Sequence, residues 1–383
     1  MNRAETITTA TKILAMIDGG TEELGPISWE ADIGRFIDQR RFEHEKQKLF
    51  LERPQLIAMS ADLPEPDSYY AVEIAGKPIL LTRDKNGVAH AFLNACRHRG
   101  VQLAEGCGHA SRFTCPYHAW TFAVDGQLLG VPQREVFDAD QLADRNLIAL
   151  PICEHNGMII VHPQPDGKLD RDEFLGAMGK HLDDYDLADI RLVSAYKGPA
   201  RINWKHAVDG GVEGYHVPFL HSTTVGPMTL NRFLHIDHGL HHILVTTQPQ
   251  ITELRDMPIE DWPEWCHFSL SHSIFPNTVL VFGQSILAFQ RSEPGSKVGE
   301  CDYSFRIYGW DRNASEQQRQ IDTFVSQMLL KVALEEDMKV QTSSQVMMEA
   351  GAVPNVLFGR KEANVINMHK NYDALAGYAQ ANA

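Results

Sequence analysis

Cysteine and histidine alternate in two short motifs that lie between residues 94 and 120. Cys96 and His98 form a Cys-x-His pair, and Cys115 and His118 form a Cys-x-x-His pair. Two Cys and two His suit either a zinc ion or an iron–sulfur cluster with Cys on one iron and His on the other. A zinc finger usually places its two Cys in one pair and its two His in the other. The mixed pairs therefore favour a [2Fe–2S] cluster whose two irons need different ligands, with zinc as the alternative.

A second group of potential metal ligands follows much later in the chain. His216 and His221 are five residues apart, which is slightly too far for one regular helical face. A distorted helix, or a break at Pro218, would be needed to aim both rings inward. Two imidazoles and one carboxylate that leave coordination positions open are the ligand set of mononuclear Fe(II) oxygenases. The pair alone is a weak signal, because the chain contains 18 histidines.

The carboxylate for such a site must come from elsewhere, and Asp337 is the best candidate. Apolar and small residues recur at three- and four-residue steps around it, at Leu330, Ala333, Val340 and Ser344. This spacing places Asp337 on a mainly apolar helical face. An acid on a buried face is costly unless it is paired or bound to a metal. Glu335 and Glu336 are the alternatives, and Glu336→Ala is expected to be mild beside Asp337→Ala.

Another group of histidines lies between His221 and Asp337 in the second half of the chain. It comprises His235, His238, His241 and His242. No motif upstream or downstream frames these residues, so we interpret them as a polar loop or a pocket wall rather than a metal site.

Length and composition predict an ordinary globular protein. The 383 residues are enough for two domains with well-packed cores. A net charge of −15 argues against nucleic acid as a partner. Six cysteines do not make a disulfide framework in a chain of this size. The sequence contains neither a secretory signal pattern at its start nor an apolar run long enough to span a bilayer, so we expect a protein of the reducing cytoplasm.

The order of patterns predicts an N-terminal segment and two domains. Residues 1–37 hold a short helical pattern, and a charged helix over residues 41–50 is expected to expose a solvated face. Residues 38–165 contain short β-like runs with turn residues at hairpin spacing, which indicates a small all-β domain. Residues 166–383 mix helices with alternating strands typical of an antiparallel sheet. A long helical pattern begins at Ser315, an N-cap residue, and runs to residue 348.

The two motifs that contain Cys96 and Cys115 resemble the Rieske motif of the large (α) subunits of Rieske non-haem iron oxygenases. Asn-x-Lys at residues 203–205, followed by Glu-x-Tyr-His and His221, is similar to the iron-site motif of the same family. The resemblance covers most of the chain, from about residue 38 to the C-terminal helix. It implies an α+β fold: an all-β Rieske [2Fe–2S] domain and an α+β catalytic domain of helix-grip (START-like) type, in which helices cover an antiparallel sheet. The segment 1–37 is expected to pack on the catalytic domain.

The resemblance also implies roles for individual residues. Cys96, His98, Cys115 and His118 would hold one [2Fe–2S] cluster per subunit. His216, His221 and Asp337 would hold one Fe(2+) per subunit.

Family members carry an acid three residues before the first iron-ligand His, and Glu213 occupies this position. In the family this acid is hydrogen-bonded to that His and, across a subunit boundary, to a cluster-ligand His. Here it would link His216 to His118 of a neighbouring subunit in a homotrimer. Most of the family has Asp at this position, and Glu occurs in relatives that act on quaternary ammonium compounds. Asp209 is the alternative bridge, with poorer spacing.

The sequence thus predicts the terminal oxygenase of a Rieske system. A separate NAD(P)H-dependent reductase, possibly with a ferredoxin, would supply electrons, because the chain contains no flavin or nicotinamide fingerprint. O2 would be used to hydroxylate a small organic substrate, aromatic or quaternary ammonium, by mono- or dioxygenation. The alternative is a Rieske-type electron carrier without oxygenase activity.

Overall fold

The computed structural model describes residues 1–378 and divides them into two compact units. One unit is Phe50–Phe174, and the other combines Met1–Leu49 with the chain from Leu175 onward. The expected boundaries at residues 38 and 165 are therefore displaced, each by about one short element. The first displacement has a clear cause, because Arg41 forms ion pairs with Glu45 and with Asp373 of the C-terminal helix.

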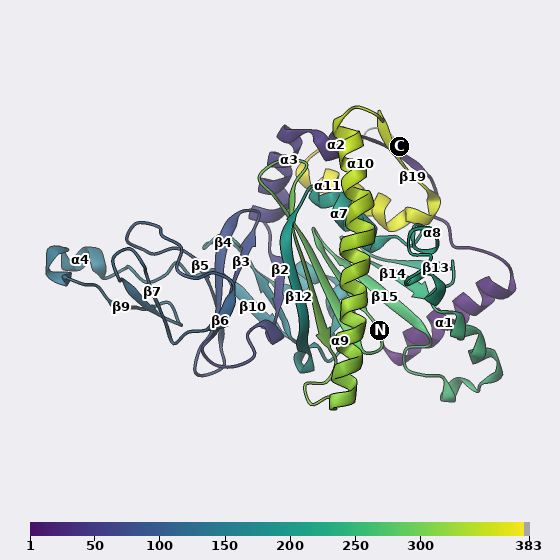
Figure 1. Ribbon diagram of the computed structural model, residues 1–383, viewed down its shortest axis with the longest axis horizontal. Coiled ribbons are helices and arrows are strands. Elements are labelled where there is room, and N and C mark those ends of the chain that lie inside the picture. The colour runs from purple at the N-terminus through teal and green to yellow at the C-terminus, as the bar shows by residue number, and fades with distance from the viewer. Residues whose placement is uncertain (379–383) are drawn as a thin grey trace. The chain divides into compact units, whose positions relative to one another are not determined.

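The unit Phe50–Phe174 is built from three small antiparallel sheets (Figure 1). Its strands are β2 (Gln55–Met59), β3 (Ser68–Ile74), β4 (Lys77–Arg83), β5 (Ala89–Leu93), β6 (Cys107–His109), β7 (Arg112–Thr114), β8 (Thr121–Ala123), β9 (Leu128–Gly130), β10 (Ile152–His155) and β11 (Met158–Val161). The sheets have the orders β5-β4-β3-β6, β7-β8-β9 and β10-β11-β2. The only α-helices within residues 50–174 are α4 (Ala139–Leu142) and most of α5 (Arg171–Leu175). This confirms the predicted all-β domain.

The larger unit is organised around a seven-stranded antiparallel sheet of order β12-β18-β17-β16-β15-β14-β13. The strands are β12 (Arg191–Ala200), β13 (Phe233–His238), β14 (His241–Thr247), β15 (Phe268–Ile274), β16 (Thr278–Phe282), β17 (Ile286–Pro294) and β18 (Cys301–Gly309). A separate pair joins β1 (Trp29–Asp32) to β19 (Asn355–Phe358). The predicted α+β class with an antiparallel sheet is confirmed.

Helices cover this sheet, and the largest is a long helix drawn in green to yellow-green in Figure 1. It consists of α9 (Glu316–Lys331), a π-helical turn (Val332–Asp337) and α10 (Met338–Glu349). The other α-helices of this unit are α1 (Arg3–Asp18), α2 (Gly34–Ile37), α3 (Gln39–Glu45), α6 (Ala177–Asp183), α7 (Trp204–Val212), α8 (Val217–Leu220) and α11 (Ala363–Ala376). Ser315 accepts a hydrogen bond from the N–H of Gln318 at 3.2 Å, which confirms it as the N-cap of α9. The π-helical turn was not predicted.

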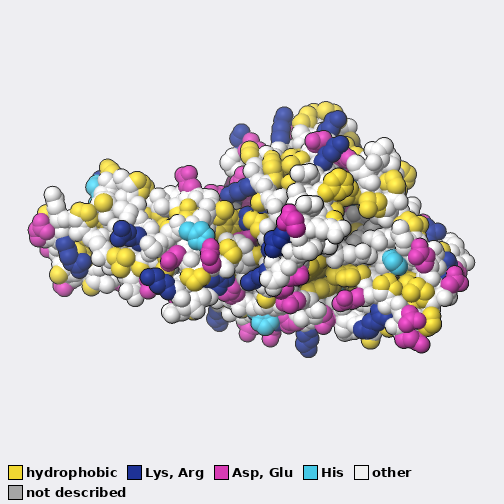
Figure 2. Space-filling model, turned by 60° about the horizontal axis from the view of Figure 1, so that its bottom comes forward, with side chains coloured by type: hydrophobic (Ala, Val, Ile, Leu, Met, Phe, Trp, Pro, Cys, Tyr) yellow, Lys and Arg dark blue, Asp and Glu magenta, His cyan; other side chains and the backbone are white. Residues whose placement is uncertain are grey.

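On the face shown in Figure 2, basic and acidic side chains are scattered, with hydrophobic patches between them. Among the described residues, no helix combines the length and the apolar character needed to span a bilayer.

Helix α7 is fixed to its surroundings by buried polar contacts at its N-terminus. Asn203 caps the helix by accepting from the N–H of Lys205 at 3.0 Å, and its amide donates to the carbonyl of Val298 at 2.8 Å. The ammonium of Lys205 is fully buried and pairs with the fully buried carboxylate of Glu45 on α3. The expectation that the helix around residues 41–50 exposes a solvated face is therefore wrong for Glu45.

Removing one partner of this pair leaves an uncompensated buried charge, so we expect Glu45→Ala to destabilise the fold by about 3–5 kcal/mol. The melting temperature should fall by on the order of 10 °C. The double variant Glu45→Gln/Lys205→Met removes both charges and should recover most of that loss. Thermal unfolding followed by circular dichroism checks this, and a Glu45→Ala protein as stable as the wild type would contradict it.

Candidate functional site

The two histidines predicted as ligands flank a very short helix. Helix α7 ends at Val212, Glu213 follows in an extended conformation, and α8 carries Pro218 in its first turn. His216 immediately precedes α8 and His221 immediately follows it. The break around Pro218 therefore does what one regular helix could not, and brings the two imidazole centroids to 5.1 Å at an interplanar angle of 75°.

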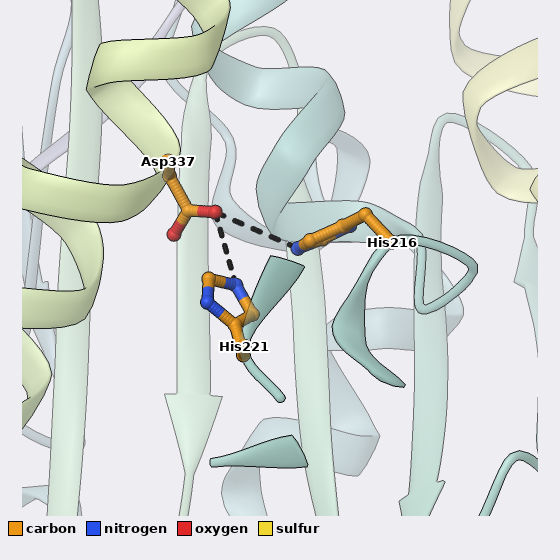
Figure 3. A group of neighbouring side chains, drawn as sticks. All are labelled: His216, His221 and Asp337. Carbon is orange, nitrogen blue, oxygen red and sulfur yellow. Dashed lines mark ion pairs between the residues drawn. The ribbon is translucent and has the colours of Figure 1, made fainter. Parts of the chain in front are cut away.

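Asp337 completes a group of three possible metal ligands (Figure 3). Its Oδ1 lies 3.0 Å from Nε2 of His221 and 3.6 Å from Nε2 of His216, and one ligand atom from each residue lies within 4.8 Å of the others. Asp337 is the last residue of the π-helical turn, and its carboxylate points between the two rings. Two imidazole nitrogens and one carboxylate converging on one point form a donor set that suits a mononuclear iron ion.

A second carboxylate holds the opposite nitrogen of each ring. Nδ1 of His216 is hydrogen-bonded to Oε1 of Glu213, and Nδ1 of His221 lies 2.6 Å from Oε2 of Glu336. Each Nδ1–H can therefore donate to a glutamate while Nε2 is left to face Asp337. Such carboxylate–histidine pairs fix the orientation of a metal-binding ring and make its free nitrogen a better ligand.

These pairs also govern the protonation of the two imidazoles. Burial lowers the pKa of His216, but the hydrogen bond to Glu213 and the charges of Glu213 and Asp337 together outweigh burial, so the pKa is raised overall. His221 follows the same pattern, because its contacts with Asp337 and Glu336 outweigh the cost of burial and raise its pKa. A metal ion must displace protons from these rings, so its affinity should fall as the pH falls.

A cavity of about 240 Å³ opens beside the group formed by His216, His221 and Asp337. Four carboxylates line it, from Asp209, Glu213, Asp337 and Glu362. Burial, with the neighbouring acids adding to it, raises the pKa of Glu362 to about 7. The rest of the wall is largely apolar and includes residues Leu220, Val340, Met348, Val356, Leu357 and Phe358. The cavity thus combines an apolar wall with several acidic side chains.

The four predicted cluster ligands lie in the other unit, on two loops closed by backbone hydrogen bonds. The N–H of Gly100 donates to the carbonyl of Cys96 at 2.9 Å, and the N–H of Ala119 donates to the carbonyl of Cys115 at 3.0 Å. Gly100 has a positive φ of 78°, a conformation that a glycine adopts without strain. Each loop therefore folds back tightly, with its Cys at the start and its His near the tip.

The donor atoms on these loops suit a [2Fe–2S] cluster with mixed ligands. The thiols of Cys96 and Cys115 are buried and hydrogen-bonded to each other, while the rings of His98 and His118 have centroids 4.7 Å apart. The ring of His98 stacks on Trp120 at 4.9 Å, and its Nδ1 is buried without a hydrogen-bond partner. A buried, unpartnered imidazole nitrogen is costly unless it binds something, which supports a ligand role for this atom.

The structure assigns other contacts to the remaining candidates. Asp209 lies 3.0 Å from Nε2 of buried His369, so it has a partner other than His216. Nδ1 of His241, in the β13–β14 hairpin, accepts from the N–H of Phe275 at 3.0 Å. The contact between Glu336 and His221 was missed, since the sequence offered Glu336 only as an alternative to Asp337. The only sequence feature that pointed to a role for Glu336 was its position next to Asp337.

Comparison with known proteins matches both units to described families. Residues 53–143 match the Rieske [2Fe–2S] domain, and residues 186–377, half of the chain, match the ring hydroxylating alpha subunit (catalytic domain). These families imply a [2Fe–2S] cluster and a mononuclear iron.

Among curated proteins, the chain is 32% identical over 217 residues to the carnitine monooxygenase oxygenase subunit of Escherichia coli (strain K12). This match covers 55% of the chain and 57% of that relative, so it spans little more than half of the relative's length.

Solved structures share the fold over almost the whole chain. The quaternary ammonium Rieske monooxygenase CntA superposes with a TM-score of 0.76 at 20% identity, covering 92% of this chain and 96% of that one. Naphthalene 1,2-dioxygenase from Rhodococcus sp. gives a TM-score of 0.75 at 20% identity, with coverages of 98% and 99%. With both family matches, the chain belongs to the ring-hydroxylating alpha subunits of the Rieske non-haem iron oxygenases.

Proposed function

We propose that the protein is the terminal oxygenase of a Rieske non-haem iron system. The convergence of His216, His221 and Asp337 carries this proposal, because an electron carrier would have no use for a second ligand set in a separate unit. When bound, the cluster supplies single electrons and the mononuclear iron supplies O2 activation for insertion into a small organic substrate. The electrons come from a separate NAD(P)H-dependent reductase, with or without a ferredoxin, in the cytoplasm.

In this proposal the chain's own residues hold the two groups and control access to them. Cys96, Cys115, His98 and His118 would hold the cluster, with the two cysteines buried. Burial raises the pKa of the Cys96 thiol, so cluster binding must displace its proton. Asp337 and the Nε2 atoms of the two histidines would hold the iron, and three protein ligands would leave coordination positions for O2 and substrate.

Glu213 is the proposed bridge for electrons between subunits. Its Oε1 contacts the ring of His216, and its Oε2 accepts from the backbone N–H of His216 at 3.2 Å, so the carboxylate is firmly placed. We propose that it also reaches His118 of a neighbouring subunit, which requires a closed ring of subunits, a homotrimer. Large apolar side chains near this site are exposed, including Phe219 at 67% and Leu357 at 69%, as expected for an interface.

The substrate is proposed to be a small aromatic or quaternary ammonium compound. The relatives include a carnitine monooxygenase and a naphthalene dioxygenase, which represent both classes. The cavity is lined by acidic side chains and, among the described residues, by no lysine or arginine, which favours a cation over an anion. Its apolar wall suits the methyl groups of a quaternary ammonium ion. This combination makes the quaternary ammonium class the better supported of the two.

The purified holoprotein should be red-brown and should bleach on reduction. Cys115→Ser or His118→Ala should lose the visible spectrum of the cluster and loosen the surrounding loops, because ligation and folding are coupled. Cys107→Ser is the matched control, because Cys107 is exposed and lies outside both loops. A colourless protein with stoichiometric zinc would contradict the cluster assignment.

Asp337→Ala should lose the mononuclear iron and all oxygenation while keeping the cluster spectrum, because the two ligand sets lie in different units. Iron analysis should fall from about three to about two irons per chain, as expected for loss of one catalytic metal beside a two-iron cluster. The exposed neighbour Glu335 provides the control variant Glu335→Ala, which should keep all of its iron. Three irons per chain in Asp337→Ala would show that another residue is the third ligand.

Glu213→Gln should retain both metals, because Glu213 supports a ligand and is not one. The loss of its charge should slow turnover by about 10- to 100-fold. The cluster should still accept electrons from the reductase, whereas its reoxidation by O2 with substrate bound should slow in rapid-mixing measurements. Reoxidation at the wild-type rate, or a fully active monomer, would refute the bridge.

A further inference from the structure

The long helix that carries Asp337 changes its winding at the metal site. Helix α9 ends at Lys331, the next six residues form a π-helical turn, and α10 begins at Met338. A π-helical turn is wider than a regular turn and is frequent at functional sites in helices. Here it ends with two consecutive acids, Glu336 and Asp337.

These two consecutive residues contact opposite nitrogens of one imidazole. Oε2 of Glu336 lies 2.6 Å from Nδ1 of His221, and Oδ1 of Asp337 lies 3.0 Å from Nε2 of the same ring. Neighbouring side chains of a regular α-helix point about 100° apart, so they do not normally hold a single small ring between them. The π-helical turn therefore occurs where both acids contact the ring of His221, whose side chain is only 3% exposed.

Glu336 is itself held in place by the loop that follows His221. The hydroxyl of Thr224 donates to Oε2 of Glu336 at 2.9 Å, the same oxygen that contacts His221. The Glu336 side chain is 19% exposed, so this arrangement lies at the edge of the interior. Because its oxygen is committed to Nδ1 and to Thr224, Glu336 is on the side of the ring away from the point where the two Nε2 atoms face Asp337.

We propose that Glu336 is a positioning residue that orients His221 for metal binding, and that the π-helical turn is the device that lets one helix supply both this residue and the ligand Asp337. The inference rests on the proposed function, since it needs a metal at His216, His221 and Asp337. It assigns to His221 the support that Glu213 gives to His216. It also replaces the expectation that a change at Glu336 is mild.

The test compares Glu336→Ala, Glu336→Gln and Glu335→Gln in the holoprotein with its cluster intact. Release of mononuclear Fe(2+) to a coloured chelator should be about 10- to 100-fold faster in Glu336→Ala than in the wild type. Glu336→Gln keeps an oxygen that can accept from Nδ1–H and should recover much of this loss. Glu335→Gln removes the same charge from an exposed neighbour and should match the wild type.

A second measurement separates orientation from general loosening. Nitric oxide added to the Fe(2+) protein with oxidised cluster gives an electron paramagnetic resonance signal whose shape depends on the arrangement of the iron's ligands. The signal should change in Glu336→Ala and return towards the wild-type shape in Glu336→Gln, while the cluster spectrum and the melting temperature stay the same.

Three results would overturn the inference. Wild-type iron release and signal in Glu336→Ala would do so and leave the oxygenase proposal intact, provided that Asp337→Ala still loses its iron. An equal loss in Glu336→Ala and Glu336→Gln, accompanied by a lower melting temperature, would assign Glu336 to the fold alone. If Asp337→Ala bound as much iron as the wild-type chain, both the oxygenase proposal and the proposal for Glu336 would be overturned.

Discussion

The catalytic unit depends on presenting the same nitrogen of two imidazoles to one point. An imidazole on a flexible side chain can rotate and exchange tautomers, so two unsupported histidines would rarely offer both Nε2 atoms together. Glu213 and Glu336 remove this freedom by engaging the two Nδ1 atoms. With the rings fixed, a single carboxylate from Asp337 completes the group. The site is therefore made by five residues, of which three can touch a metal and two determine where the others point.

This arrangement places demands on elements far from the site. His216 and His221 follow α7 on a short connected segment, and Asp337 lies on the long helix, so the three can meet only if both helices keep their positions. The N-terminus of α7 is fixed by Asn203, whose N–H donates to the side chain of Gln345 on α10 at 3.1 Å. The buried pair of Lys205 and Glu45 ties the same end of α7 to α3. Burying two charges carries a large desolvation cost, which good geometry offsets only in part. The buried pair instead fixes the position of α7, because both charges are satisfied in only one position of that helix.

The sequence predicted the features that depend on local patterns. Alternating strands and turn residues were enough for the antiparallel sheets, and Ser315 marked the start of the long helix because an N-cap is recognised within four residues. Pro218 between the two histidines correctly signalled that no regular helix could carry both. Features that depend on distant partners were not predicted. Glu45 appeared to belong to a solvated face because its partner, Lys205, is 160 residues away. The π-helical turn was missed because periodicity analysis assumes constant winding, and a widened turn shifts the register after it. The proposed role of Glu336 was missed for the same reason, because a regular helix would not direct Glu336 and Asp337 to the same imidazole.

Each set of ligands lies within one compact unit, so each metal group can be held without help from the other unit. Binding and folding of the two sites are thus separable, whereas the proposed electron transfer requires both sites. The two glutamates that support the histidines, Glu336 and Glu213, differ in the same way. Glu336 contacts His221 and Thr224, both residues of its own unit, through the same oxygen. Glu213 lines a cavity whose surroundings include exposed apolar side chains, and it is the one of the two that another subunit could reach. Two carboxylates with the same local task, orienting an imidazole, therefore have different further uses in the proposed oxygenase: one supports the metal site alone, and the other would also connect that site to an electron donor.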